Sequence, residues 1–471
     1  MRSVHPFAVS ALTVWLIATP ACADEPSEPA ATEDDVEAEE RRDAHDEAGD
    51  LRRREVPDYD GRPDPGPSPE ESLLWIPRIL TSPLYVISEY LIRAPLGWLT
   101  TELERSRAFE FLFDVFVFGP DRSIGVFPTA FFDFGLAPSA GLYAFWDGFL
   151  FDQNHARLHA ATGGEDWLTL TVTDTWRPED DVGLTLRLAL LKRPDQQLGV
   201  IENPLPEDRP PLTRYGIETV EAGARFEWRP WSRNVIGWGA KYRGVGFIDE
   251  RYDENPSIGE VYGPDQRPGL FDSGFSSVDL DLHIVVDSRP TTDLLTGGVR
   301  AVGDVVLHVS PSGPRLATWI NWSLELGLAT DVLGSGRVLS VTAAVQGVSP
   351  AGEAVVPFID LPELGGVNGP LPGFQFGYVR GRSIAAVRLG YEWPLFALLD
   401  GTLHWGVGNV FGDTFTDFDV ELLRMSFGVS LAPRWGGDHL FEMGLAFGTA
   451  PFRDGAGIES VRFFVGARNG L

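Results

Sequence analysis

From Trp167 to the C-terminus, the chain repeatedly alternates apolar and polar residues in short stretches separated by turn-forming residues. In one stretch every second residue is apolar, namely Ile320, Trp322, Leu324, Leu326 and Leu328. Because successive side chains of a strand point to opposite faces, each stretch predicts a strand with one apolar and one polar face. Many such strands in series predict an all-β membrane protein, a closed barrel with lipid outside and polar groups inside.

The first residues predict a signal peptide over 1–23. A basic start precedes an apolar run over 7–18, and the Ala-Cys-Ala triplet at 21–23 supplies the small residues of a cleavage site. The run is too short to span a membrane as a helix. Lipidation of Cys22 stays open as an alternative. Cleavage after the triplet would leave a mature chain without cysteine, which excludes disulfides and thiol catalysis.

The chain is acidic, with a formal net charge of −30. This charge offers no electrostatic attraction to nucleic acid, so we expect no nucleic-acid partner. The 14 Trp and 30 Phe residues are many for an acidic soluble enzyme. They suit a barrel whose aromatic side chains lie at both membrane interfaces, with outer-membrane lipid as its surroundings. Together with the export signal, these features predict a protein of the bacterial outer membrane.

Two segments precede the predicted barrel. Residues 24–70 are rich in Glu, Asp, Pro and Ala, which predicts a disordered acidic tail in the periplasm. This tail is either a solvated spacer or a docking segment for a basic partner. Residues 71–118 carry an apolar series that Pro77, Pro83 and Pro95 interrupt, which predicts short amphipathic helices. These helices lie either against the membrane or on the barrel rim.

Residues 119–471 contain a pattern that predicts sixteen antiparallel transmembrane strands, an even number as single-chain bacterial barrels require. If the face that carries Arg225 and Arg229 met lipid, each arginine near the membrane centre would destabilise the barrel by about 2–4 kcal/mol. This face is therefore predicted to point inward. The predicted strands start near Ser123, Ser139, Ala156, Trp167, Val182, Ile217, Asn234, Ser277, Val299, Ala317, Val338, Ser383, Gly401, Glu421, His439 and Ile458.

Three predicted connections are long, over 197–215, 250–276 and 359–382. If the N-terminus is periplasmic, each of them joins an odd-numbered strand to the next even-numbered one. Strand parity therefore predicts that all three lie at the extracellular end, where such barrels carry their longer loops.

The third long loop, 359–382, is rich in glycine and proline and ends in Val379-Arg380-Gly381, directly before a predicted strand. Here the chain resembles the BamA/TamA outer-membrane assembly family of the bacterial surface-antigen superfamily. In that family a Val-Arg-Gly motif lies at the tip of a loop that folds back into the barrel. The resemblance covers about 359–413 and is weaker over the rest of the barrel. It implies a role in inserting or translocating outer-membrane or secreted proteins, with unfolded outer-membrane proteins as clients.

The motif arginine, Arg380, is predicted to hold the loop to the lumen wall, because a guanidinium is permanently charged and can form bidentate bonds. The chain departs from the family here. Arg382 replaces the aromatic residue after the motif, and Gly406 stands where the family has the aspartate that pairs with the motif arginine. A buried arginine without a carboxylate is costly, so another partner is required. Glu392 and Asp400 are the possible partners.

The segment 24–70 is too short and too polar for a POTRA domain, so the resemblance is to members of the family that lack such domains. We therefore expect clients to be delivered by a separate periplasmic partner.

No motif typical of catalysis stands out in the sequence. The histidines are scattered, and none lies in a Gly-x-Ser-x-Gly nucleophile motif. The sequence also has no metal-ligand spacing and no phosphate-binding loop. We therefore expect no enzyme activity, catalytic residue, metal or cofactor. A passive pore and a structural surface antigen without transport activity remain alternative functions.

Overall fold

The computed structural model describes residues 115–131, 136–231, 233–289, 297–311, 316–331, 336–366, 369–396, 399–433 and 442–466. The chain divides into two compact units, and all of these residues belong to the unit that contains 97–471. The predicted signal peptide 1–23, the acidic tail 24–70 and residues 71–114 of the predicted helical segment lie outside the described residues.

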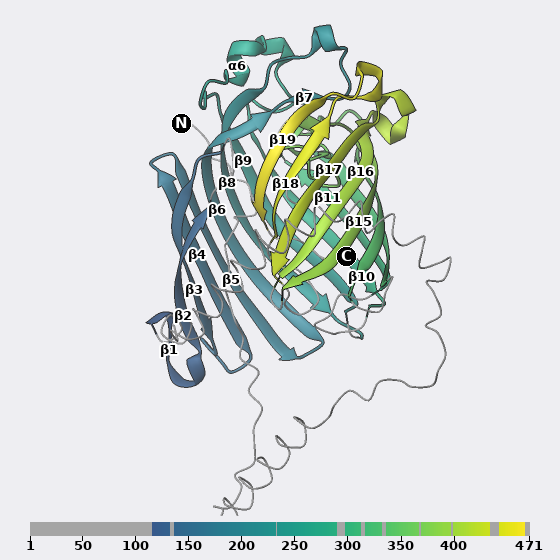
Figure 1. Ribbon diagram of the computed structural model, residues 1–471. Helices are drawn as coiled ribbons and strands as arrows, with labels where there is room; N and C mark the ends of the chain where they lie inside the picture. The colour runs from purple at the N-terminus through teal and green to yellow at the C-terminus, as the bar shows by residue number, and fades with distance from the viewer. Residues whose placement is uncertain are drawn as a thin grey trace, which may run out of the picture. The chain divides into compact units, whose positions relative to one another are not determined.

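Within the described residues the chain is almost entirely β-strand (Figure 1). The strands are β1 (Val117–Phe118), β2 (Ile124–Phe131), β3 (Ser139–Asp147), β4 (Asn154–Gly164), β5 (Trp167–Glu179), β6 (Val182–Leu198), β7 (Val200–Ile201), β8 (Thr213–Trp228), β9 (Val235–Ile248), β10 (Phe275–Asp287), β11 (Gly298–Ser310), β12 (Ala317–Asp331), β13 (Val338–Pro350), β14 (Val379–Arg380), β15 (Ser383–Phe396), β16 (Leu399–Phe411), β17 (Arg424–Pro433), β18 (Glu442–Thr449) and β19 (Ile458–Gly466). One four-residue helix, α6 (Ile258–Val261), and several single 3₁₀ turns complete the described elements.

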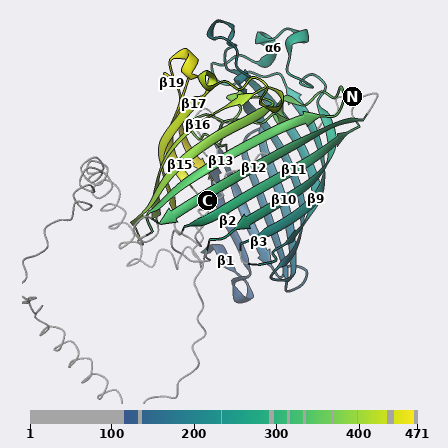
Figure 2. The same ribbon diagram turned by 90° about the vertical axis from the view of Figure 1, so that its right-hand side faces the viewer.

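Seventeen of these strands form one large sheet, in which strands that follow each other along the chain pair antiparallel (Figure 2). The strands β7 and β14 are not part of this sheet and pair with each other in parallel. Each predicted strand start lies within four residues of an observed start. The predicted number of sixteen differs from the nineteen strands observed in the described residues, three of which contain only two residues.

Val117 and Phe118 form the strand β1, although they lie within the segment predicted to be helical. They pair with Gly125 and Ile124 of β2. Gly119 has a φ of 88°, which only glycine adopts readily, and it starts the reversal between the two strands. A β-branched and an aromatic residue next to such a turn favour a hairpin over a helix.

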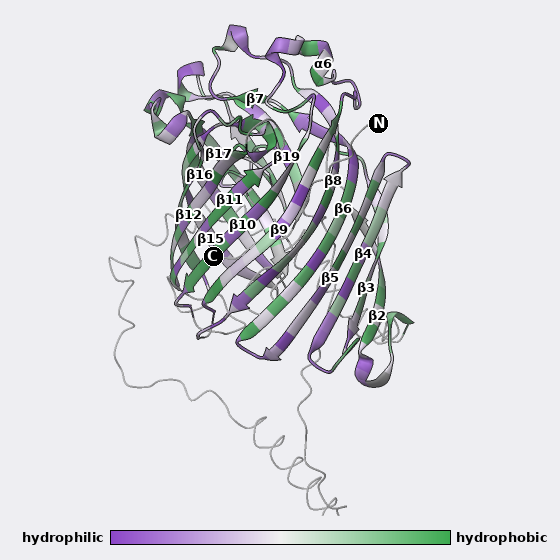
Figure 3. Ribbon diagram, turned by 180° about the vertical axis from the view of Figure 1, so that it is seen from behind, coloured by the Kyte–Doolittle hydropathy of each residue, from purple (hydrophilic) through white to green (hydrophobic). Residues whose placement is uncertain are grey.

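The outer face of the sheet is apolar, as the alternating colours along the strands show (Figure 3). Exposed apolar side chains recur at every second residue, as in Leu186, Leu188 and Leu190 of β6 and Leu280, Leu282, Ile284 and Val286 of β10. The residues between them, such as Asp279 and Asp281, point to the inner face. An apolar face of this extent on the outside of a sheet needs an apolar environment to cover it.

The long connections lie at one end of the sheet, where α6 and β7 are seen (Figure 1). Buried apolar clusters form where these connections meet the inner face of the strands. One cluster contains Leu364, Leu371, Phe374, Val379, Ile384, Ala386 and Val410. Another contains Tyr215, Ile217, Ile258, Phe271 and Phe358 with neighbouring leucines. The apolar core of this fold therefore packs loops against strands rather than one sheet against another.

Among the described residues, no helix combines the length and the apolar character needed to cross a membrane.

Candidate functional site

The Val-Arg-Gly motif lies inside the barrel, at the end of the loop 359–382. Val379 and Arg380 form β14, and they pair with Val200 and Ile201 of β7 from another long connection. Val379 is fully buried, and Arg380 is 2% exposed. Gly381 lies so close to Val410 that a Cβ atom there would stand 2.7 Å from the valine Cβ, so only glycine fits.

The Arg380 guanidinium holds its own loop together. Its Nη2 lies 2.9 Å from a carboxylate oxygen of Glu363. Its Nη1 donates hydrogen bonds to the carbonyl oxygens of Ile359 at 3.0 Å and Leu361 at 3.3 Å. The cation also lies over the Phe376 ring, 5.2 Å from the centroid. The charge is thus paired, as a buried arginine requires.

The predicted partners, Glu392 and Asp400, were wrong, because the carboxylate on Arg380 is Glu363. Glu392 lies nine residues beyond Ser383 along β15, a distance of about 30 Å at the usual rise of a strand. Asp400 lies at the same far end, where it pairs with Pro394 in the register of β15 and β16. Arg380, by contrast, precedes β15 at the end that carries the long loops.

Glu363 is the acidic member of this pair. The Glu363 side chain is largely buried, with 22% of its surface exposed. This burial raises the pKa of the Glu363 carboxyl above its usual range, while Arg380 and a hydrogen bond from the Gly377 backbone N–H act in the opposite direction.

The stem of the loop is bound to the wall by a second buried arginine. Arg243 of β9 donates from Nη1 and Nη2 to the two carboxylate oxygens of Asp360, at 2.7 and 2.6 Å. Trp319 Nε1 donates to the same carboxylate at 3.0 Å. Arg243 also contacts Asp279 at 3.0 Å, which in turn lies 2.7 Å from His308. This ion pair was not predicted from the sequence. The signal for it was the inward position of Arg243, because a buried arginine needs a carboxylate partner.

The tip of the loop is bound to the last strands of the sheet. Arg462 of β19 donates hydrogen bonds to the carbonyl oxygens of Gly366 at 2.9 Å and Pro372 at 3.3 Å. The backbone N–H of Gly373 donates to Ser426 of β17 at 2.8 Å. Because its stem is held by β9 and β12 and its tip by β17 and β19, the loop crosses the barrel interior.

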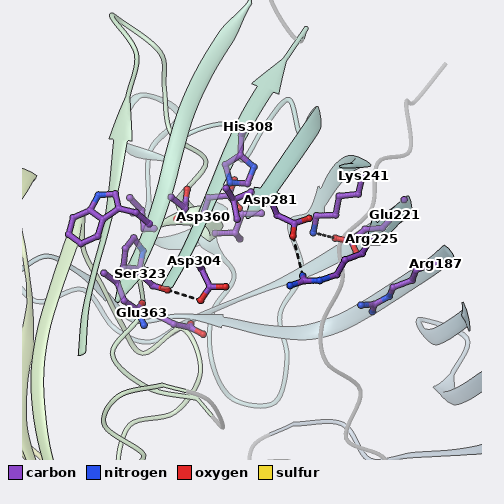
Figure 4. Close-up of a pocket in the computed structure, with 18 of the residues that line it drawn as sticks. Arg187, Glu221, Arg225, Lys241, Asp281, Asp304, His308, Ser323, Asp360 and Glu363 are labelled. Carbon is purple, nitrogen blue, oxygen red and sulfur yellow. Dashed lines mark hydrogen bonds and ion pairs between the residues drawn. The ribbon is translucent and has the colours of Figure 1, made fainter. Parts of the chain in front are cut away.

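A cavity of about 830 Å³ lies below the loop, with β6, β8, β9 and β10 among its walls (Figure 4). Its walls carry six acidic residues, Glu221, Glu227, Asp281, Asp304, Asp360 and Glu363, and four basic ones, Arg187, Arg225, Lys241 and Arg380. Most of these charges are paired, as Lys241 with Glu221 at 3.0 Å and Arg225 with Asp281 at 3.1 Å. No group of three or more potential metal ligands occurs in the part of the chain that is described.

These observations define an antiparallel β-barrel with an apolar outer face, a charged lumen and a loop bound inside it. No family model matches the sequence. No curated protein matches it either.

The chain is similar to a number of solved structures, two of which are described here. The first is the crystal structure of BamA from Haemophilus ducreyi lacking POTRA domains 1–3, with 14% identity and a TM-score of 0.50, covering 74% of this chain and 70% of that one. The second is CdiB from Acinetobacter baumannii, with 10% identity and a TM-score of 0.46, covering 73% of this chain and 59% of CdiB. The first likeness shows that this chain has the fold of the BamA structure.

Proposed function

We propose that this protein is a barrel of the bacterial outer membrane, in which sixteen long strands span the bilayer after a short helical entry segment. The proposal is supported by the alternation between exposed apolar and inward charged residues on the strands. The protein assists the insertion or translocation of outer-membrane or secreted proteins, using the seam where the first and last long strands come together. Its clients are unfolded outer-membrane proteins, delivered by a periplasmic partner.

The observation that carries this proposal is the loop 359–382, which is bound at its stem to β9 and at its tip to β19. A loop that touches both walls of the lumen blocks free diffusion and links distant strands. The same loop carries the Val-Arg-Gly motif that resembles the BamA/TamA family, and the fold agrees with the BamA structure. We further propose that the protein acts by binding and positioning clients, without catalysis.

Depletion of the protein from its native bacterium tests this function. We expect the amounts of other outer-membrane proteins to fall, measured by quantitative mass spectrometry of the isolated outer membrane. Re-expression of the wild-type chain should restore them, and Arg380→Ala should restore them less well at equal abundance. Unchanged amounts of other outer-membrane proteins after depletion would contradict the proposal and favour a structural surface antigen.

A passive pore is the second candidate, because the charged cavity of about 830 Å³ offers a polar space inside the barrel. Conductance in planar bilayers separates the two functions. A barrel closed by its loop should give a small, flickering current. A large and steady open current would favour the pore.

A further inference from the structure

Arg187 is the exception among the basic side chains of the cavity. Arg225, Lys241 and Arg380 each have a carboxylate within 3.1 Å. Arg187, among the described side chains that line the cavity, has neither an ion pair nor a hydrogen bond. Figure 4 shows it extending from the wall beside Arg225, which is joined to Asp281 by a dashed line. Arg187 is exposed to the space of the cavity, and a charged side chain inside a transmembrane protein is a candidate binding group.

One neighbour of Arg187 offers an unused hydrogen-bonding group. The register of β5, β6 and β8 places Thr173 on one side of Arg187 and Gly223 on the other. The Thr173 hydroxyl faces the cavity and has no hydrogen-bond partner in the described structure. Gly223 has no side chain, which lets the neighbouring strand approach closely: an added Cβ would lie 2.5 Å from the Cβ of Lys241.

The chemistry of the cavity selects among anions. A guanidinium next to a hydroxyl binds the two oxygens of a carboxylate through charge-assisted hydrogen bonds. The six acidic residues of the lining outnumber the four basic ones. A ligand with several negative charges would be repelled by this excess, whereas a single carboxylate is neutralised by Arg187. A polypeptide that presents one carboxylate at a time meets this requirement.

We propose that Arg187 and Thr173 bind a single aspartate or glutamate side chain of an extended polypeptide in the lumen. This inference rests on the proposed function. It specifies that the client segment held in the lumen carries an acidic side chain. The loop 359–382 covers the cavity from the end that carries the long connections. The client segment therefore enters from the end with the short turns.

The test measures peptide binding to the full-length protein in lipid nanodiscs by fluorescence anisotropy. The probe is a labelled, uncharged twelve-residue peptide of glycine, serine and threonine with one central glutamate. A control peptide of the same sequence carries glutamine in place of the glutamate. The variants are Arg187→Gln and Thr173→Val. The control is Lys192→Gln, which removes a positive charge from the same strand, where Lys192 pairs with Asp166 at 2.7 Å and does not line the cavity.

We expect the glutamate peptide to bind the wild-type protein about tenfold more tightly than the glutamine peptide, the gain of a charge-assisted hydrogen bond. Arg187→Gln should abolish this difference, Thr173→Val should reduce it and Lys192→Gln should leave it unchanged. Acetate should compete better than inorganic phosphate.

Equal binding of the two peptides, or an unchanged difference in Arg187→Gln, would overturn the proposal. Better competition by phosphate would overturn the choice of a carboxylate. Since no assembly reaction is involved, a negative result here leaves the depletion test of the proposed function unaffected.

Discussion

Arg243 and Asp360 form a buried bidentate ion pair between the wall of the barrel and the stem of its internal loop, with N–O distances of 2.7 and 2.6 Å. The two residues are 117 positions apart in the chain. The pair fixes the start of the loop 359–382, ten residues after β13 ends at Pro350. Together with Arg380 and Arg462, this pair holds the loop inside the barrel.

Removal of the Asp360 carboxylate should destabilise the protein strongly. Asp360→Ala leaves Arg243 buried without this partner, which costs about 3–5 kcal/mol in comparable buried pairs. Urea unfolding in lipid vesicles, followed by tryptophan fluorescence, measures the loss. Asp413→Ala is the matched control, because Asp413 pairs with Arg382 at an exposed position and such pairs contribute about 0–1 kcal/mol. Equal losses in the two variants would contradict the role of the buried pair.

Arg380→Ala should release the loop without unfolding the barrel. The substitution removes the cation that binds Glu363 and two loop carbonyl groups. Extracellular protease should then cleave within 366–380, and the heat-modifiable gel shift of the folded protein should weaken. Glu392→Gln and Asp400→Asn should leave the loop protected, since both residues lie at the other end of the strands. Wild-type protection in Arg380→Ala would mean that the motif is incidental.

Stability should depend on pH through Glu363. Because burial raises the pKa of this carboxyl, its protonated form stabilises the folded state. This contribution is fully present below the ordinary glutamate pKa of about 4.3 and is lost as the pH rises through the raised value. The unfolding free energy of the wild type, relative to that of Glu363→Gln, should therefore decrease with increasing pH. Parallel pH profiles for the two proteins would show that the carboxyl titrates as it does in the unfolded chain.

Gly377 should resist substitution more than another glycine of the same connection. Gly377 has a φ of 72°, and an added Cβ would lie 2.3 Å from the carbonyl oxygen of Gln197. Gly352 has a φ of 65°, but nothing lies within 4 Å of an added Cβ. Alanine at either site suffers the left-handed backbone cost of about 1–2 kcal/mol. Gly377→Ala should lose about 1–3 kcal/mol more by steric overlap. Similar unfolding free energies for the two variants would contradict the close approach of the loop to Gln197 in β6.

The strands and their inward faces could be predicted from the sequence because they depend on a local pattern of period two. The starts of β3, β5 and β6 are reproduced to the residue, since turn-forming residues mark them. The short strands β7 and β14 could not be predicted, because each exists only where two distant loops meet. The same is true of β1, which depends on pairing with the edge of β2.

The motif arginine could be located from the sequence, but its partner could not. Glu392 and Asp400 follow the motif within 20 residues, but an antiparallel strand carries such neighbours to the opposite end of a barrel. Glu363 precedes the motif by 17 residues, and only the folding of the loop brings the two together. Arg243 and Asp360 illustrate the same limit, because many acidic residues could have paired with an inward arginine.

Site-directed spin labelling across one strand tests most directly whether the apolar face meets lipid. Single cysteines at the neighbouring positions Ser323 and Leu324 of β12, in a Cys22→Ala background, are spin-labelled and studied by electron paramagnetic resonance in lipid vesicles. Leu324 is 43% exposed on the outer face, while Ser323 lines the cavity and donates to Asp304. The label at Leu324 should be accessible to oxygen dissolved in the bilayer and protected from a water-soluble nickel reagent, and the label at Ser323 should lack this lipid signature. Equal access of the nickel reagent to both labels would contradict the account.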